Sequence, residues 1–397
     1  MGGFTITDYI SVDSNIIFCI IAAWVIDTVL GGLLAPINPV RLLSFLVKHS
    51  KKRFIALLQS ISDKNPDKAE FYESAAGCLH AAYVITLVFV SLAVALDLAR
   101  RLHESLYYAL TIFFLFSSLS ARRIAGMALE AANTIKRGSL PEAGAIAHKM
   151  TGIAGGDSYV SGGSVGGSAG DGFGRGGSDG DSAGGGSPGQ QFMSAFSKET
   201  IIRVVVGSVS RGSIDHVISP MLFITAGALL GIPVPFVYAL MASYPLASSS
   251  ARDHGHSMRF DMVGKTLSNA LAFIPARLSL VLLPLSSLLS GHGFLTCFRI
   301  MRRDHGNNIN PRGVWGESAF AGALKIQLGG HTFHSSGSSF SSSRSSFSSG
   351  GATKIPLIGD DSKAPEASDI GEAVKIMMTA SIVTVALALA ILFQFNY

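Results

Sequence analysis

The sequence predicts an all-α, multi-pass integral membrane protein, and two observations carry this prediction. First, 48% of the 397 residues are hydrophobic and only 14% are charged, with a mean hydropathy of +0.42, whereas soluble domains carry about 25% charged residues. Second, apolar residues gather in runs that approach the roughly 20 residues a helix needs to cross a bilayer. We therefore expect about six transmembrane helices, together with two disordered low-complexity inserts.

Six apolar runs are candidates for spanning helices. The last is the cleanest, because no charged residue occurs from Ile376 to the C-terminus. The fourth contains GIPVP at Gly231–Pro235, so it is either one kinked helix or a tight re-entrant hairpin, and hydropathy leaves both open. In chain order the runs are Ile16–Leu34, Leu79–Leu96, Leu106–Leu119, Val217–Leu246, Leu267–Leu289 and Ile376–Phe395.

Basic residues between the runs predict the orientation in a cell membrane. The segment Arg41–Lys68 holds seven Lys and Arg, so the positive-inside rule places 41–76 in the cytoplasm and the N-terminus outside. Segments 122–200 and 299–373 then also fall inside. Whether Arg252–Lys265 lies inside depends on the fourth run, because a hairpin there places it inside and a single crossing places it outside. Orientation explains the net charge of +5, and we expect no nucleic acid as a partner.

Composition also divides the chain. Two segments are dominated by Gly and Ser and hold too few apolar residues to offset the entropy of ordering. Capping patterns at Ser139–Glu142 and at Asp369 with Glu372 predict helix starts. The predicted parts are 1–151, N-terminal membrane helices and cytoplasmic loops; 152–191, a flexible insert; 192–334, further membrane helices; 335–368, a Ser-rich linker; and 369–397, the C-terminal transmembrane helix.

Two charges interrupt apolar runs. Asp27 lies in the first run, and Arg277 follows Pro275 in the fifth. A charge at that depth costs at least about 2.5–3.5 kcal/mol, so it normally faces a partner or a wet cavity. The alternative is that each lies near a helix end and snorkels to the surface. The three cysteines are far apart, and we expect them to be small core residues rather than disulfides or metal ligands.

Several ordered stretches resemble the adenosylcobinamide-phosphate synthase (CobD/CbiB) family of cobalamin biosynthesis. Asp27–Arg41, DTVLGGLLAPINPVR, is similar to the family's N-terminal Asp, Leu-Gly and His-Pro-Val-Arg. Ile274–Arg277 is similar to its Ile-Pro-Ala-Arg. Asn308–Gly330 resembles its Asn-Ala-Gly-Trp-Pro followed by Ala-Gly-Ala-Leu and Leu-Gly-Gly. The resemblance runs from about residue 20 to 335 without the glycine insert, and it identifies the chain as a divergent member.

The resemblance implies a reaction and its participants. The family joins adenosylcobyric acid to aminopropanol phosphate as an amide, with ATP and Mg²⁺. The implied partners are a corrinoid substrate, the lipid bilayer and other membrane proteins of cobalamin assembly. The expected catalytic residues are Asp27, Asp215 and Arg277, with Asp27 and Asp215 also as metal ligands; the expected substrate-binding residues are Asn38, Arg41, Asn310 and Glu317.

The chain departs from the family mainly by losing acids. The family's His before Pro-Val is Asn38 here, and its Glu and Asn before Asp215 fall on Arg211 and Gly212. Carboxylates that would hold Mg²⁺–ATP are therefore mostly missing. The alternative function is a catalytically degenerate relative that binds a corrinoid or scaffolds the pathway without ATP chemistry. A transporter built on broken helices is a third possibility, but no inverted repeat is visible in the sequence.

Overall fold

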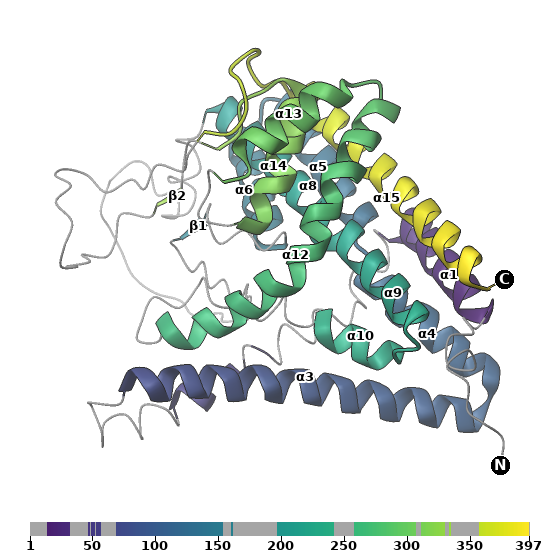
Figure 1. The fold of residues 1–397 in the computed structure, drawn as a ribbon. Helices are drawn as coiled ribbons and strands as arrows, with labels where there is room; N and C mark the ends of the chain where they lie inside the picture. Colours follow the sequence, from purple (N-terminus) through teal and green to yellow (C-terminus); the bar gives the residue numbers. More distant parts are fainter. Residues whose placement is uncertain are drawn as a thin grey trace, which may run out of the picture.

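The protein is an assembly of packed α-helices (Figure 1). The computed structural model describes residues 14–31, 47, 49–51, 53–56, 69–153, 160–161, 197–241, 258–306, 311–329, 333–334 and 357–396. The described helices are α1 (Ser14–Leu30), α3 (Ala69–Leu102), α4 (Glu104–Ser118), α5 (Ala121–Lys136), α6 (Leu140–Ile153), α8 (Lys198–Ser213), the π-helix η4 (Ile214–Ile218), α9 (Ser219–Leu229), α10 (Val234–Met241), α12 (Met258–Leu289), α13 (Phe294–Asp304), α14 (Pro311–Leu324) and α15 (Ala367–Asn396).

Five stretches of helix are long and apolar enough to cross a membrane. They are Phe71–Leu102, Glu104–Lys136, Lys198–Leu229, Met262–Leu289 and Ala367–Phe395, and a shorter apolar helix covers Asn15–Leu30. This confirms the predicted class, a multi-pass all-α membrane protein with about six spans. The strands β1 (Val160–Ser161) and β2 (Phe333–His334) have two residues each and pair in parallel.

The predicted run Val217–Leu246 is not one continuous helix. The π-helix η4 opens it, α9 ends at Leu229, Gly231 adopts a φ of +63°, and the Ile232 N–H donates to the Gly227 carbonyl at 2.8 Å. The chain then turns, and α10 begins at Val234 and packs on α9, α3 and α4 (Figure 1). A positive φ is readily adopted only by glycine, so GIPVP forms the turn of a helical hairpin. Residues 242–246 lie outside the described part.

Helix α12 bends and joins two regions of the molecule. Its first half lies along α3, where the two backbones come so close that a Cβ on Gly77 would lie 2.6 Å from the Phe260 carbonyl oxygen. Its second half rises in a different direction and packs on α13, α14 and α15 (Figure 1). Pro275 and Pro284 lie inside the helix. Proline removes a backbone donor and clashes with the preceding turn, which accounts for a bend.

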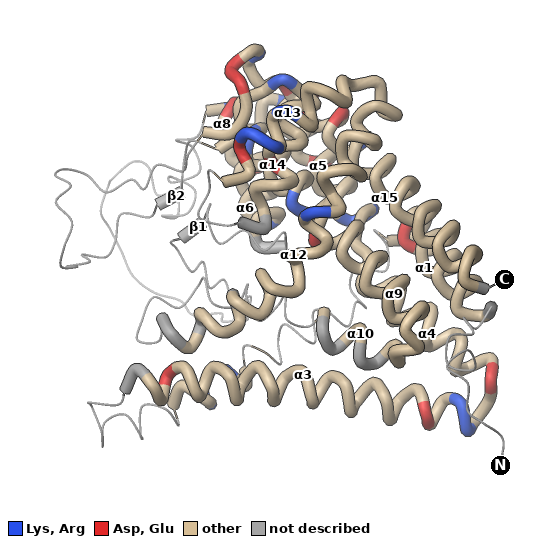
Figure 2. Tube along the Cα trace, in the orientation of Figure 1, with Lys and Arg blue, Asp and Glu red and all other residues tan. Residues whose placement is uncertain are grey.

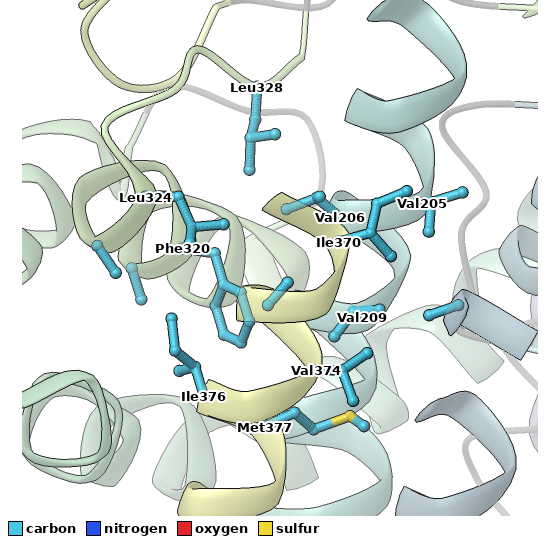
Figure 3. Close-up of a cluster of buried hydrophobic side chains, with 14 of the residues drawn as sticks. Val205, Val206, Val209, Phe320, Leu324, Leu328, Ile370, Val374, Ile376 and Met377 are labelled. Carbon is cyan, nitrogen blue, oxygen red and sulfur yellow. The ribbon is translucent and has the colours of Figure 1, made fainter. Parts of the chain in front are cut away.

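The largest buried cluster lies between α5, α6, α8, α13, α14 and the first half of α15. Figure 3 shows its centre, where Phe320 of α14 points toward Val209 of α8 and Val374 of α15. Smaller clusters hold α1, α4, α9, α10 and the second half of α15 together, and attach α3 to α10. Helices of the two segments that the charge rule places inside, 122–200 and 299–373, thus pack into one body.

Residues 357–366 are held on this body just before α15. Ile358 is fully buried and exchanges two backbone hydrogen bonds with Leu328, at 2.8 and 2.9 Å. Asp369 accepts from the Glu366 N–H at 2.7 Å and from Lys363 Nζ at 2.8 Å. Because α15 already begins at Ala367, the prediction of Asp369 as an N-cap is wrong in register: it lies in the first turn and reaches back. The predicted start after Ser139 is confirmed by α6.

Candidate functional site

A buried ion pair joins α8 to α14. The Arg211 guanidinium donates from Nε to Glu317 Oε1 at 2.7 Å, and its Nη2 also contacts that oxygen. The two side chains are only 4% and 0% exposed. Removing two charges from water is costly, and the attraction between them offsets that cost only when the geometry is good. The two charged groups therefore hold each other in place inside the protein.

Two glycines of α14 make this approach possible. A Cβ on Gly313 would lie 2.8 Å from Arg211 Nε, and one on Gly316 would lie 2.5 Å from the Ser210 carbonyl oxygen. The obstacle at Gly316 is backbone, which cannot turn aside as a side chain can, so the missing Cβ of glycine lets α14 lie against α8 at this level. The glycines of the RGVWGES stretch thus place Glu317 against Arg211.

Asp215 lies one turn after Arg211, on the π-helix η4. π-Helices are rare and occur often at functional sites, because the extra residue in the turn displaces backbone and side chains from the regular α-helical positions. The Asp215 Oδ1 atom is buried and has no hydrogen-bond partner among the described residues. A buried carboxylate oxygen without a donor is costly. Asp215 is thus a predicted site residue whose surroundings call for an additional partner.

Arg277 lies on the outside of α12, directly after the Pro275 bend, and its side chain is exposed. Its guanidinium carbon lies 3.5 Å from the centre of the Phe273 ring and 5.7 Å from that of Trp315 on α14. Stacking on aromatic faces orients a guanidinium without neutralising it. Among the described residues it makes no ion pair, so its charge is available to an anionic ligand.

Asp27 has a structural partner that the sequence did not reveal. Its side chain is 2% exposed, and its carboxylate accepts hydrogen bonds from the backbone N–H groups of Arg122 and Ala121. These donors open α5, whose N-cap residue Ser120 makes no side-chain capping bond. Carboxylates are stabilised at helix N-termini by the free N–H groups and the helix dipole. Asp27 therefore caps α5 from another helix.

The structure brings some predicted site residues near each other and leaves others apart. Asp215 follows Arg211 by one turn on η4, and Glu317 of α14 is bonded to Arg211. Helix α12, which carries Arg277, packs on both η4 and α14. Asp27, which belongs to α1, contacts the start of α5 instead. Asn38, Arg41 and Asn310 fall outside the described residues. The sequence did not lead us to include Arg211 in the site, because Arg211 stands where the resembled family has an acid and was considered only as the loss of that acid.

The acids do not assemble a magnesium site among the described residues. No group of three or more His, Cys, Asp or Glu side chains comes together there. Asp27 already accepts two backbone donors, and Glu317 is bonded to Arg211. Asp215 Oδ1 has no hydrogen-bond partner among the described residues. Because Mg²⁺ requires several oxygen ligands in near-octahedral geometry, these residues by themselves do not fit the ion.

Comparisons with known proteins agree with the resemblance seen in the sequence. The model of the family described as "CobD/Cbib protein" matches residues 192–377, a range that contains Arg211, Asp215, Arg277 and Glu317. The chain is 25% identical to "Cobalamin biosynthesis protein CobD" of Klebsiella pneumoniae subsp. pneumoniae over 93% of its length and 95% of the relative's. It is 24% identical to "Cobalamin biosynthesis protein CbiB" of Salmonella typhi over the same shares. No solved structure matches.

Proposed function

We propose that this chain, a divergent relative of the CobD/CbiB proteins with that family's domain over 192–377, acts in cobalamin biosynthesis at the membrane. Its relatives are named for that pathway, and its helices suit a multi-pass membrane location. The reaction we propose is the ATP-dependent joining of adenosylcobyric acid to aminopropanol phosphate as an amide. The resemblance seen in the sequence suggests this reaction, and the surroundings of Arg277 and Asp215 support it.

One observation carries the proposal. The Arg277 guanidinium lies against the Phe273 and Trp315 rings and makes no ion pair among the described residues. Its helix, α12, also packs on η4, where the buried Asp215 Oδ1 atom has no hydrogen-bond partner among those residues. A corrinoid carboxylate and an aminopropanol phosphate are both anions. A cation held in place by ring stacking can bind and orient either of them with no cost of reorganisation during the reaction.

In this proposal the chain's own groups have separate tasks. Arg277 binds the phosphate or carboxylate of a substrate, and Phe273 and Trp315 hold its plane. Asp215 accepts a hydrogen bond from the amine. Magnesium, when bound with ATP, would supply charge neutralisation for phosphoryl transfer. Arg211 and Glu317 fix α14 against α8, which keeps Trp315 in place beside Arg277.

The second candidate function is a non-catalytic relative that binds a corrinoid or scaffolds the pathway. The Arg211–Glu317 pair favours it, because a basic residue replaces a family acid and then engages the acid of α14. In that case Arg277 binds corrinoid carboxylates, and ATP has no role.

A product assay separates the two. Membranes containing the protein receive adenosylcobyric acid, aminopropanol phosphate and Mg²⁺–ATP, and mass spectrometry detects the amide product. If the protein is a ligase, the amount of product should fall at least tenfold in Arg277→Gln. It should be unchanged in Arg137→Gln, because Arg137 is exposed at the end of α5. Absence of product, in membranes where a family member with its full set of acids gives product, would reject the enzyme and leave the binding relative.

A further inference from the structure

The corner between α12 and α13 exposes apolar side chains outside the candidate site. Leu288 and Leu289 at the end of α12 are 52% and 63% exposed, and Leu295 in the first turn of α13 is 71% exposed. Single exposed leucines are ordinary on protein surfaces. These three, however, lie on the two sides of one tight turn, in which Gly291 has a φ of +89°. They form a local apolar tip that we name the α12–α13 corner.

The outer face of α13 continues from this tip with basic residues. Cys297, Ile300, Met301 and Asp304 form the buried face of the helix. Leu295, Arg299 and Arg302 are spaced i, i+4 and i+7, so they share the opposite face, and all three are exposed. Figure 2 shows basic residues on and beside α13. A leucine at the start and arginines further along give this face the character of a membrane-surface helix.

The two arginines on this face are not neutralised within the described part of the chain. The adjacent Arg303 donates to Asp304 and to Asp360, each at 2.7 Å. Arg299 and Arg302 make no such ion pair with a described acid. Their charge is directed away from the body of the protein and is available to an external anion.

Contacts of the corner with α15 place it at the level where a membrane surface is expected. Ser290 donates to Thr379 Oγ1 at 3.0 Å, and His292 Nε2 lies 3.7 Å from Glu372 Oε2. On α15, Lys375 is the last charged residue, and the remaining chain to Tyr397 is uncharged. The corner thus lies where α15 changes from charged to uncharged and mostly apolar, which is how a helix enters a bilayer.

An exposed apolar stripe of α12, on the C-terminal side of Arg277, also leads to the corner. Leu278 and Val281 are 41% and 61% exposed, on a helix long and apolar enough to lie in a membrane. The exposed stripe continues through Leu285 to Leu288. A surface continuous with an exposed apolar stripe, and edged by arginines, complements a lipid bilayer with anionic headgroups.

We propose that the α12–α13 corner lies in the headgroup region of the membrane and binds anionic phospholipids. Leu288, Leu289 and Leu295 enter the boundary with the acyl chains, and Arg299 and Arg302 bind lipid phosphates. The cytoplasmic leaflet is the expected side, since the basic stretch Arg299–Gly306 is predicted to lie inside. This inference does not depend on the proposed reaction.

A probe at Leu295 tests the depth of the corner. The full chain carries Leu295→Cys in a Cys78→Ala background, because Cys78 is exposed whereas Cys19 and Cys297 are buried. An environment-sensitive fluorophore on this cysteine is examined in phosphatidylcholine–phosphatidylglycerol vesicles with quenchers attached to the lipid and with aqueous iodide. Ser368→Cys, exposed at the start of α15, is the aqueous control. The proposal predicts strong lipid quenching at 295 and mainly iodide quenching at 368.

Lipid retention tests the arginines. Protein purified from mixed vesicles is examined by native mass spectrometry for bound phosphatidylglycerol and phosphatidylcholine. Each arginine near an anionic surface contributes roughly a fivefold factor in affinity, so Arg299→Gln with Arg302→Gln should lower phosphatidylglycerol retention by at least about tenfold. The control Lys136→Gln with Arg137→Gln removes the same charge from the exposed end of α5 and should leave retention unchanged.

Three results would overturn the proposal. Iodide quenching at 295 equal to that at 368 would place the corner in water. Protection of the 295 probe from both quenchers would mean that protein, such as a second copy of the chain, covers it. Equal loss of phosphatidylglycerol in the two double variants would show that only net charge matters and that α13 has no lipid-binding role.

Discussion

Arg211 and Glu317, which are 106 residues apart in sequence, form a buried ion pair across the α8–α14 interface, with Arg211 Nε 2.7 Å from Glu317 Oε1. The pair joins α8 to α14 at the point where glycines let the two helices touch. It also occupies a position where the resembled family carries an acid, so the charge pattern of this interface differs from the family's.

Breaking this pair should destabilise the protein strongly. Glu317→Ala leaves the Arg211 guanidinium buried without its carboxylate, which costs about 3–5 kcal/mol of unfolding free energy in buried pairs. The double variant Arg211→Met with Glu317→Leu replaces both charges with apolar groups of similar size and should recover most of that loss. Denaturant unfolding in detergent measures both.

The exposed pair Arg101–Asp97, at 2.8 Å on α3, provides the control for this experiment. Asp97→Ala should change stability little, because solvent screens exposed charges. If Glu317→Ala is as mild as Asp97→Ala, the buried pair does not hold α8 to α14.

The close contact of α14 with α8 makes a second prediction. Gly316→Ala places a Cβ 2.5 Å from the Ser210 carbonyl oxygen and should lower the free energy of unfolding by about 1–3 kcal/mol, as overpacking does. The matched control is Gly126→Ala inside α5, where nothing lies within 4 Å of the new Cβ. That change should stabilise by roughly 0.5–1 kcal/mol, the gain in helix propensity. A neutral Gly316→Ala would argue against the tight approach.

Asp27 should act on the stability of α5. Asp27→Ala removes the acceptor for the N–H groups of Ala121 and Arg122 and should cost about 0.5–2 kcal/mol, as loss of an N-cap does. Asp27→Asn keeps one acceptor oxygen and should lose less. Hydrogen exchange at the first turn of α5 reports the effect locally. Unchanged exchange there in Asp27→Ala would exclude the capping role and return Asp27 to the list of metal ligands predicted from the sequence.

The attachment of residues 357–366 should depend on pH through Asp304. Burial alone would raise the pKa of this carboxyl, but hydrogen bonds from the Arg303 guanidinium and the Gly359 N–H outweigh burial and hold the pKa below its usual value near 4. A lowered pKa means that Asp304 stabilises the fold fully above about pH 4, the unfolded value, and loses this contribution as pH falls through the folded pKa.

Exchange of the Gly359 amide measures this dependence. Protection should fall as the solution is acidified below about pH 4, relative to the amides of α14 that contact α8. In Asp304→Asn the protection should be low already at neutral pH and should lose its acid dependence. Acid-dependent exchange that persists in Asp304→Asn would assign the effect to another carboxyl.

The fold was predictable from sequence to the extent that it depends on local composition. The apolar runs gave the class and most of the spans, and the predicted helix over Ile376–Phe395 lies within α15. Glycine and proline at Gly231–Pro235 indicated a break, but choosing the hairpin required the packing of α10 on α3 and α4. The start of α15 shifted because Asp369 reaches back to Glu366 and Lys363, contacts that a capping pattern does not specify.

The site was less predictable, because its partners are distant in sequence. Arg277 was singled out correctly as an unusual charge, yet its stacking on Trp315 depends on how α12 bends and packs. Asp27 was noticed for the same reason, and its partner proved to be the start of another helix, which no spacing reveals. Arg211 was counted only as a missing acid. The signal that could have found it is that Arg211 and Glu317 are each the only charged residue of an otherwise uncharged stretch, 204–214 and 313–324.

Corrinoid binding is the measurement that tests the central claim most directly, because both the enzyme and a non-catalytic relative that binds a corrinoid require it. The absorption of adenosylcobyric acid reports its equilibrium binding to the purified full chain, to Arg277→Gln and to the control Arg137→Gln. We expect binding that weakens by roughly 10–100-fold in Arg277→Gln, the value of hydrogen bonds to a charged group, and is unchanged in the control. No binding to the unaltered chain, or equal binding to Arg277→Gln, would contradict this account of the site.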